Sequence, residues 1–101
     1  MNRDKKYQPP NRGKHFRNEA GYSLKQVAFL LDIKNFGRIS EWENGISNPS
    51  LENAIGLAII YQRFESQIYY ELRKKIAQKI EHRRKLLTDS KGQQLGADTG
   101  G

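Results

Sequence analysis

The stretch SLKQVAFLLDIKNFGRISEWENG, residues 23–45, decides the fold that this sequence predicts. Ser23 is a favourable helix N-cap, and Gln26 follows it at the spacing of a capping box. A helix is therefore expected to begin here. Its apolar side chains recur at helical spacing, at Val27, Ala28 and Leu31.

The second half of the stretch predicts another short helix. Residues 32–37 interrupt the first helix, and Ile39 and Trp42 then share one face of the next. Asn44-Gly45 ends it, because both residues tolerate the left-handed conformation. Two short helices joined by a tight turn form a helix-turn-helix, a unit that can place its second helix in the major groove of DNA.

Three more helices are expected around this unit, over residues 11–20, 51–62 and 65–87. The turn Asn48-Pro49-Ser50 caps the second of these. No run alternates apolar and polar residues in the manner of a strand, so the predicted class is all-α.

The composition limits the possible functions. The chain has 101 residues, a formal net charge of +7 and no cysteine. One folded unit is expected, with no disulfide framework or thiolate zinc site and with a polyanion as the first partner to consider. No apolar run approaches the ~20 residues of a membrane span, which favours a soluble, cytoplasmic protein.

Catalytic motifs are lacking. The sequence has no glycine-rich phosphate loop, no metal-spaced histidine cluster and no nucleophile motif, and His15 and His82 stand alone. The sequence therefore predicts a protein that is not an enzyme and that needs neither a metal nor another cofactor.

Three zones differ in composition. Residues 1–10 are polar and basic and are predicted to form a flexible basic arm, and residues 11–87 hold nearly all the large apolar side chains and form the candidate domain. Residues 88–101 are predicted to form a disordered tail, since they hold one large apolar residue and cannot offset their ordering entropy.

Four sequence motifs, in this order along the chain, support a more specific prediction of the fold and the function. FRNEAGYSL (16–24), VAFLL (27–31), ISEWENG (39–45) and NPSLE (48–52) together resemble the lambda/Cro repressor-type helix-turn-helix family, also called the XRE family, over residues 12–72. The resemblance implies a compact five-helix lambda-repressor-like domain that binds operator DNA, usually as a dimer. The last predicted helix extends beyond the family's usual fifth helix.

The chain departs from the family pattern in three places. Leu24 replaces a glutamine that touches the DNA backbone in most members, and Asp32 replaces the glycine of the turn. The turn itself is one residue longer than the common form, so the first residue of the recognition helix is less sharply defined.

The resemblance also assigns roles to single residues. Arg17 and Glu43 match a partly buried ion pair of some members; the alternative is that both are solvated surface charges. Asn44 matches a phosphate-contacting residue. Ser23 matches a helix N-terminus whose amides point at phosphate, although it serves equally well as a cap alone.

The residues between the two helices and on the second are the candidates for base contacts: Asn35, Phe36, Gly37, Arg38 and Glu41. Arginine can bond guanine with two hydrogen bonds, asparagine can pair with adenine, glutamate can accept from cytosine, and phenylalanine can touch a thymine methyl. Arg38 is the strongest candidate, with a phosphate contact as its alternative, and Phe36 has a core position as its alternative.

Contacts to the DNA backbone are expected from basic and polar residues near the helix-turn-helix: Arg12, Lys14, Ser23, Lys25, Lys34, Ser40 and Asn44. Basic residues cluster a second time over residues 73–85, on the last helix. That cluster is either a solvated face or a further backbone contact.

The C-terminal half carries more apolar surface than one packed face requires. The residues expected in dimer contacts or in packing of the C-terminal helix are Ile55, Ile59, Ile68, Leu72, Ile76 and Ile80. The stripe that begins at Ile68 either folds back on its own domain or packs against a second copy, and dimerisation is the preferred reading because such domains usually bind two half-sites.

The sequence thus predicts a DNA-binding transcriptional regulator, a repressor, that acts on double-stranded operator DNA as a homodimer. The alternative is an antitoxin that represses its own operon and binds a toxin protein through the C-terminal helix. Non-specific RNA binding is a weaker third hypothesis, since no sheet with exposed aromatic residues is predicted.

Overall fold

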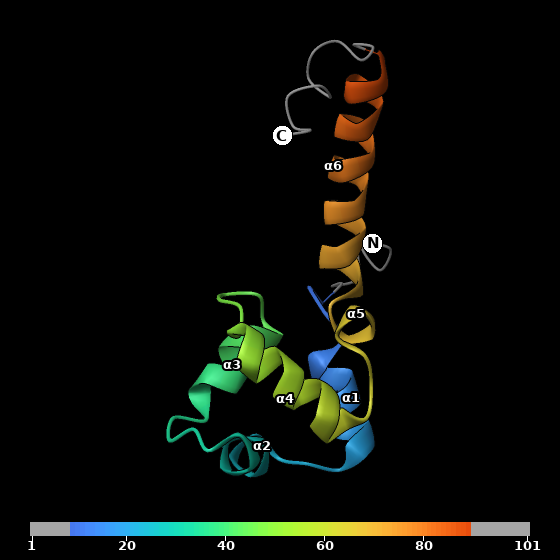
Figure 1. Cartoon of the computed structure of the whole chain (residues 1–101). Helices are drawn as coiled ribbons and strands as arrows, with labels where there is room; N and C mark the ends of the chain where they lie inside the picture. The colour runs from blue at the N-terminus through green and yellow to red at the C-terminus, as the bar shows by residue number, and fades with distance from the viewer. Residues whose placement is uncertain (1–8, 90–101) are drawn as a thin grey trace, which may run out of the picture.

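The computed structural model describes residues 9–89, which form six helices and no strand. They are α1 (Gly13–Ala20), α2 (Leu24–Leu31), α3 (Gly37–Glu43), α4 (Leu51–Tyr61), α5 (Glu65–Ile68) and α6 (Tyr70–Asp89). The helices α1 to α5 gather into a bundle, and α6 projects from it as a single long helix (Figure 1). The all-α prediction and the long C-terminal helix are thus confirmed.

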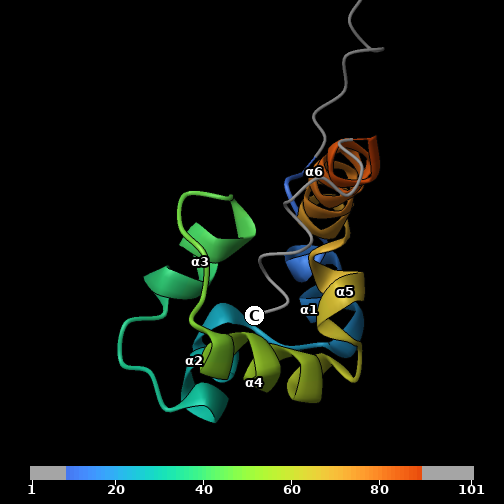
Figure 2. The same cartoon turned by 45° about the horizontal axis from the view of Figure 1, so that its top comes forward.

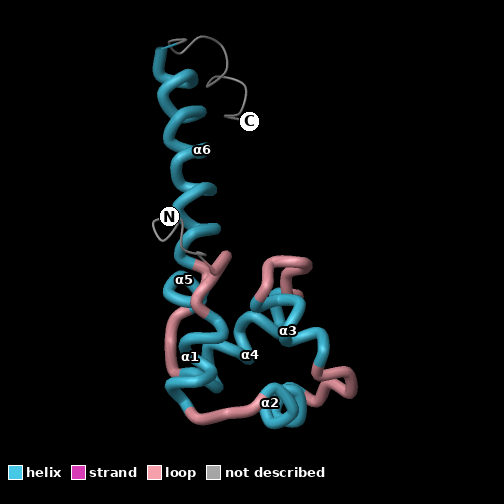
Figure 3. The backbone as a smooth tube through the Cα atoms, turned by 180° about the vertical axis from the view of Figure 1, so that it is seen from behind, coloured by secondary structure: helices cyan, strands magenta, loops and turns pink. Residues whose placement is uncertain are grey.

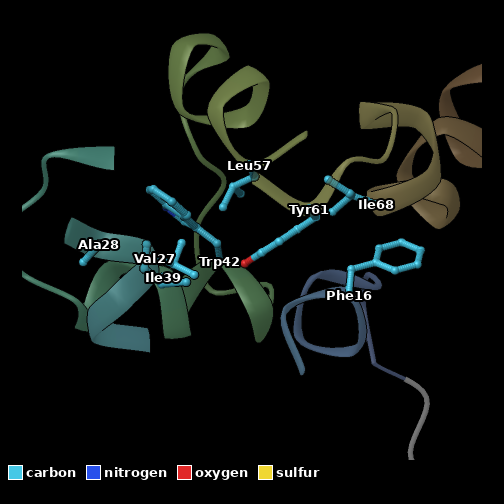
Figure 4. Close-up of a cluster of buried hydrophobic side chains, with 8 residues drawn as sticks. All are labelled: Phe16, Val27, Ala28, Ile39, Trp42, Leu57, Tyr61 and Ile68. Carbon is cyan, nitrogen blue, oxygen red and sulfur yellow. The ribbon is translucent and has the colours of Figure 1, made fainter. Parts of the chain in front are cut away.

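The core is built from the inner faces of the first five helices. Its fully packed side chains are Phe16, Val27, Ala28, Ile39, Trp42, Leu57, Tyr61 and Ile68 (Figure 4). At Gly56 of α4, an added Cβ atom would collide with the tip of the Leu31 side chain of α2. The leucine side chain would therefore have to shift to admit a larger residue at this position.

Left-handed residues end the first four helices. Gly21 and Gly45 have the positive φ that glycine adopts freely, whereas Asp32 and Gln62 adopt it at φ 61° and 56°. Each is followed by an amide that donates to a carbonyl five residues earlier, as Ile33 does to Ala28 at 2.8 Å. Asp32 thus adopts the left-handed conformation for which the family pattern has a glycine.

One helix that the sequence predicts as continuous is divided in the structure. The helix expected over residues 65–87 breaks at Tyr69, whose ψ of 44° departs from helical geometry, and becomes α5 and α6 (Figure 3). The break lets Ile68 enter the core with 0 % of its surface exposed, while no residue of α6 is buried. Ile68 therefore packs on its own domain, as one of the two alternatives for the stripe has it, and the break separates it from Leu72, Ile76 and Ile80.

The boundaries of the predicted zones also differ. Helix α1 begins at Gly13 because Asn11 turns its side chain inward, where Nδ2 donates to the Trp42 carbonyl at 2.9 Å and Oδ1 accepts from the Gly13 amide at 2.8 Å. Helix α6 runs to Asp89, so Thr88 and Asp89 are helical and are not part of a tail. The rest of the predicted arm and tail, residues 1–8 and 90–101, lies outside the described residues.

An ion pair joins α1 to α3 inside the bundle. Arg17 Nε donates to Glu43 Oε2 at 2.7 Å and Arg17 Nη2 to Glu43 Oε1 at 3.1 Å, with side-chain exposures of 10 % and 8 %. Arg17 Nη1 also donates to the Tyr22 carbonyl at 3.1 Å. The hydrogen bond to Glu43 raises the pKa of Arg17, so the guanidinium keeps its charge.

The phenols near this pair stay neutral at physiological pH. Burial, followed by the negative charge of Glu43, raises the pKa of Tyr69 to about 12, and the same two causes raise the pKa of Tyr61.

Among the helices of residues 9–89, none has both the length and the apolar character that a membrane crossing requires.

We expect Glu43→Ala to lower the free energy of unfolding by about 3–5 kcal/mol, because it leaves a buried guanidinium without its counter-ion. Urea denaturation of the purified protein measures this change. The double variant Arg17→Met/Glu43→Leu should recover most of the loss, since it removes both charges and keeps apolar volume. A loss below ~0.5 kcal/mol for Glu43→Ala would show that the pair is energetically equivalent to surface charges.

Candidate nucleic-acid interface

Helices α2 and α3 lie next to each other in the bundle (Figure 2). The side chains that they turn toward the core are small or apolar. Val27 and Ala28 of α2 are 0 % and 4 % exposed, and Ile39 and Trp42 of α3 are 1 % and 2 % exposed. Because these four positions fill the inner faces, the polar residues between them must face away from the core. The outer face of α3 presents Arg38 and Glu41, both exposed.

The N-terminal end of α2 is formed by the predicted capping box. The Gln26 amide donates to Ser23 Oγ at 3.1 Å, and the Ser23 amide donates to Gln26 Oε1 at 2.8 Å. Ser23 is therefore a cap, and the first-turn amides of Leu24 and Lys25 are left over at the positive end of the helix dipole. This geometry suits an anion such as a phosphate.

Lys25 and Phe36 meet across the turn between the helices. The Lys25 Nζ atom lies 5.5 Å from the centre of the Phe36 ring, and Phe36 is 40 % exposed. The ring therefore covers no deep core position. A cation–π contact at this distance holds the ammonium near the start of α3.

Asn35 is engaged in the structure of the turn. Its Oδ1 accepts from the Gly37 amide at 2.8 Å and so caps the start of α3. A Cβ atom added at Gly37 would come within 3.0 Å of the same oxygen, so the cap also favours glycine at that position. While the cap is intact, one lone pair of Asn35 Oδ1 is engaged and the side chain is held in place, so Asn35 can turn toward a base less freely than a solvated asparagine.

Arg38 lies against the indole of Trp42. Its Cζ atom is 5.5 Å from the centre of the Trp42 ring, one helical turn further along α3. The stacking restricts the long side chain and leaves its N–H edges open, so less entropy is lost when they bind a partner. Glu41 lies on the same exposed side of the helix and supplies acceptor oxygens.

Ser40 and Asn44 form one unit at the end of α3. Asn44 Nδ2 donates to the Ser40 carbonyl at 2.9 Å and lies 3.4 Å from Ser40 Oγ. Asn44 is exposed and Ser40 is partly exposed, so both can reach a ligand on this side of the helix.

Three more residues predicted to contact the DNA backbone are exposed. They are Arg12, Lys14 and Lys34. Arg12 is tied to the region around α1 and α5, because its amide donates to the Ile68 carbonyl at 2.8 Å and its guanidinium lies over the Phe16 ring. Arg63 covers the same ring and pairs with Glu19 at 2.9 Å.

Sequence reasoning did not find the contribution of Trp42 to this surface, although it placed Trp42 in the core. The spacing of four residues between Arg38 and Trp42 was the available signal. It also missed Asn11, which joins the start of α1 to the end of α3 through the Trp42 carbonyl. No group of three or more His, Cys, Asp or Glu side chains within residues 9–89 is placed to hold a metal ion.

The arrangement offers guanidinium, ammonium, carboxylate, amide and phenyl groups on one short helix and the turn before it. These are the groups that bond base edges and phosphates in a major groove. A family model described as Helix-turn-helix matches residues 14–63 of the chain. No curated protein and no solved structure matches it.

We expect Asn35→Ala to lower the free energy of unfolding by about 1 kcal/mol, because the Gly37 amide loses its acceptor. Asn35→Asp should keep the stability within ~0.5 kcal/mol, since a carboxylate caps equally well. Thermal or urea unfolding measures both. Equal losses for the two variants would mean that the cap is not what Asn35 contributes.

Proposed function

Residues 14–63 belong to the lambda/Cro repressor-type helix-turn-helix family of DNA-binding transcriptional regulators, and on this premise we propose that the chain is a repressor that recognises a specific operator through α3. The observation that supports this most directly is Arg38, exposed on the outer face of α3 and stacked on Trp42. A guanidinium held in this way can bond O6 and N7 of guanine, the commonest specific contact in the major groove.

The other residues divide into two roles. We assign base contacts to Arg38, Glu41, Phe36 and the Nδ2 atom of Asn35, with Gly37 allowing close approach of the backbone. Backbone contacts are assigned to the positive end of α2 with Lys25, to Lys34, and to the Ser40–Asn44 pair; Arg12 and Lys14 extend this charge along α1. These contacts would give a strong salt dependence to binding.

We further propose that the protein binds a two-fold symmetric operator as a homodimer. Ile55 and Ile59 lie one turn apart on α4 and are 41 % and 71 % exposed, on the helix that packs against α2. A shared apolar patch next to the helix-turn-helix could fix the distance between two copies of α3, as recognition of two half-sites requires. Binding of this kind would place the protein in the cytoplasm, with the DNA.

One observation supports a second role beside repression. Helices α5 and α6 follow the segment that the family model matches, and no residue of α6 is buried. An antitoxin, which represses its own operon and binds a toxin protein through such a helix, would use both parts of the chain. A toxin-like reading frame next to the gene would favour this alternative, whereas an isolated gene would count against it.

We expect Arg38→Ala to reduce sequence discrimination by about 1–3 kcal/mol at one base pair, because the bidentate contact to guanine is lost. Operator duplexes are first selected from random DNA, and fluorescence anisotropy then compares the selected site with its single-base variants. Lys34→Ala is the control, and it should weaken binding to all duplexes alike and reduce the salt slope by about 1. If Arg38→Ala behaves like this control, Arg38 contacts phosphate.

We expect Ile59→Asp to convert the dimer to a monomer, since it places a charge in the centre of the proposed α4 contact. Sedimentation across a range of concentrations measures the association, and anisotropy with full and half operators measures its consequence for DNA. The matched control is Ile76→Asp on α6, which should leave the dimer intact. A wild-type protein that stays monomeric at high concentration, with and without DNA, would exclude the homodimer.

A further inference from the structure

A groove of about 620 Å³ runs between α6 and the N-terminal end of α4. One wall is α6, and the rest is formed by Asn48, Pro49 and Ala54 together with Glu65 and Ser66 of α5. Most of the surface is apolar, and the side chains that provide it on α6 and at its start are Tyr69, Leu72, Ile76, Ala77 and Ile80. The segment that the family model matches ends at residue 63, before the α6 wall begins.

No part of residues 9–89 covers the α6 side of this groove. Leu72, Ile76 and Ile80 are 41 %, 48 % and 48 % exposed, and they recur on one face of the helix. Figure 1 shows α6 leaving the bundle without a neighbouring helix along most of its length. A lone helix with an apolar stripe gains stability when a partner covers the stripe.

The charge of α6 indicates what kind of partner fits. The helix carries seven Lys and Arg residues against three Asp and Glu residues. The lining of the groove holds two basic side chains, Arg73 and Arg84, and two acidic ones, Glu65 and Glu81, of which Glu81 is paired with Arg84 at 3.4 Å. Arg73 has no acidic partner among the described residues. The lining is therefore balanced in charge, and the excess of positive charge lies on the rest of α6, beside the apolar floor.

Four other occupants fit this combination less well. A second copy of α6 would bring the same excess of positive charge alongside, which disfavours pairing. Residues 90–101 hold one large apolar side chain, Leu95, and cannot fill the groove. A bilayer is flat and a phosphate backbone gains nothing from leucine and isoleucine, so neither matches a two-walled apolar groove.

We propose that this groove binds an acidic amphipathic helix of another protein, with the apolar face of that helix on Leu72, Ile76 and Ile80. From Tyr69 to Arg84 the wall is about 23 Å long, which accommodates about four helical turns of a partner. Carboxylates on the flanks of the partner would meet Arg73 and its basic neighbours. The binding energy comes mainly from the apolar face, and the charges select an acidic partner over a basic one.

The test uses the full chain and a pair of synthetic 18-residue helical peptides with the same leucine face. One peptide carries glutamate at all other positions and the other carries lysine. Anisotropy of the labelled peptides should show binding at least tenfold tighter for the acidic peptide. Ile76→Asp should weaken it at least tenfold, whereas Gln78→Asp, which adds the same charge on the opposite side of α6, should change it less than threefold.

Because no residue of α6 is buried, these variants should fold as the wild type does, and circular dichroism checks this. Arg73→Glu/Arg84→Glu should reduce or reverse the preference for the acidic peptide. The proposal is wrong if the two peptides bind equally, or if Ile76→Asp and Gln78→Asp have equal effects. It is also wrong if Ile76→Asp dissociates a dimer, which would make a second copy the occupant, or if it abolishes binding to phosphatidylglycerol vesicles that the wild type binds.

This proposal does not depend on the proposed DNA recognition. Ile59→Asp and Arg38→Ala lie outside the groove, and both should leave peptide binding within threefold of the wild type. Conversely, Ile76→Asp should leave operator binding unchanged. Failure of the groove proposal would therefore leave the assignment of α3 standing, and failure of operator binding would leave the groove proposal standing.

Discussion

The buried pair of Arg17 and Glu43 is the constraint on which the arrangement of the bundle depends. Within residues 9–89 this ion pair links α1 to α3, and about nine-tenths of each side chain is removed from water. Such a pair tolerates little displacement, because moving either partner leaves an unpaired charge in the core. It therefore fixes the end of α3, next to which Asn11 binds the Trp42 carbonyl. The orientation of the exposed face of α3 follows from this.

The same residues that build the core also arrange the surface. Trp42 is 2 % exposed and closes the core, yet its ring supports the guanidinium of Arg38. Asn35 shows the opposite case, because a residue that the sequence predicts as a base contact caps α3. Helix α3, with seven residues, has few hydrogen bonds of its own, so its caps and packing contacts must hold it in place.

The C-terminal third shows what the regular spacing of apolar residues cannot predict. Ile68, Leu72, Ile76 and Ile80 have the same spacing and the same chemistry, and the sequence analysis treated them as one stripe. The break at Tyr69 separates them, so that Ile68 is fully buried and the other three line an open groove. A spacing of four residues records that side chains share a helix face, but it does not record whether the helix continues unbroken or what the face meets.

The sequence by itself determined the local elements of this protein. The capping box at Ser23, the left-handed position at Asp32 and the stop at Asn44-Gly45 depend on neighbouring residues alone, and so the helix-turn-helix could be predicted from a short window. Only the tertiary structure decided which polar groups are used internally, that Trp42 supports Arg38, and that α6 stands apart from the bundle. These depend on contacts between residues distant in the chain, whose geometry no local pattern specifies.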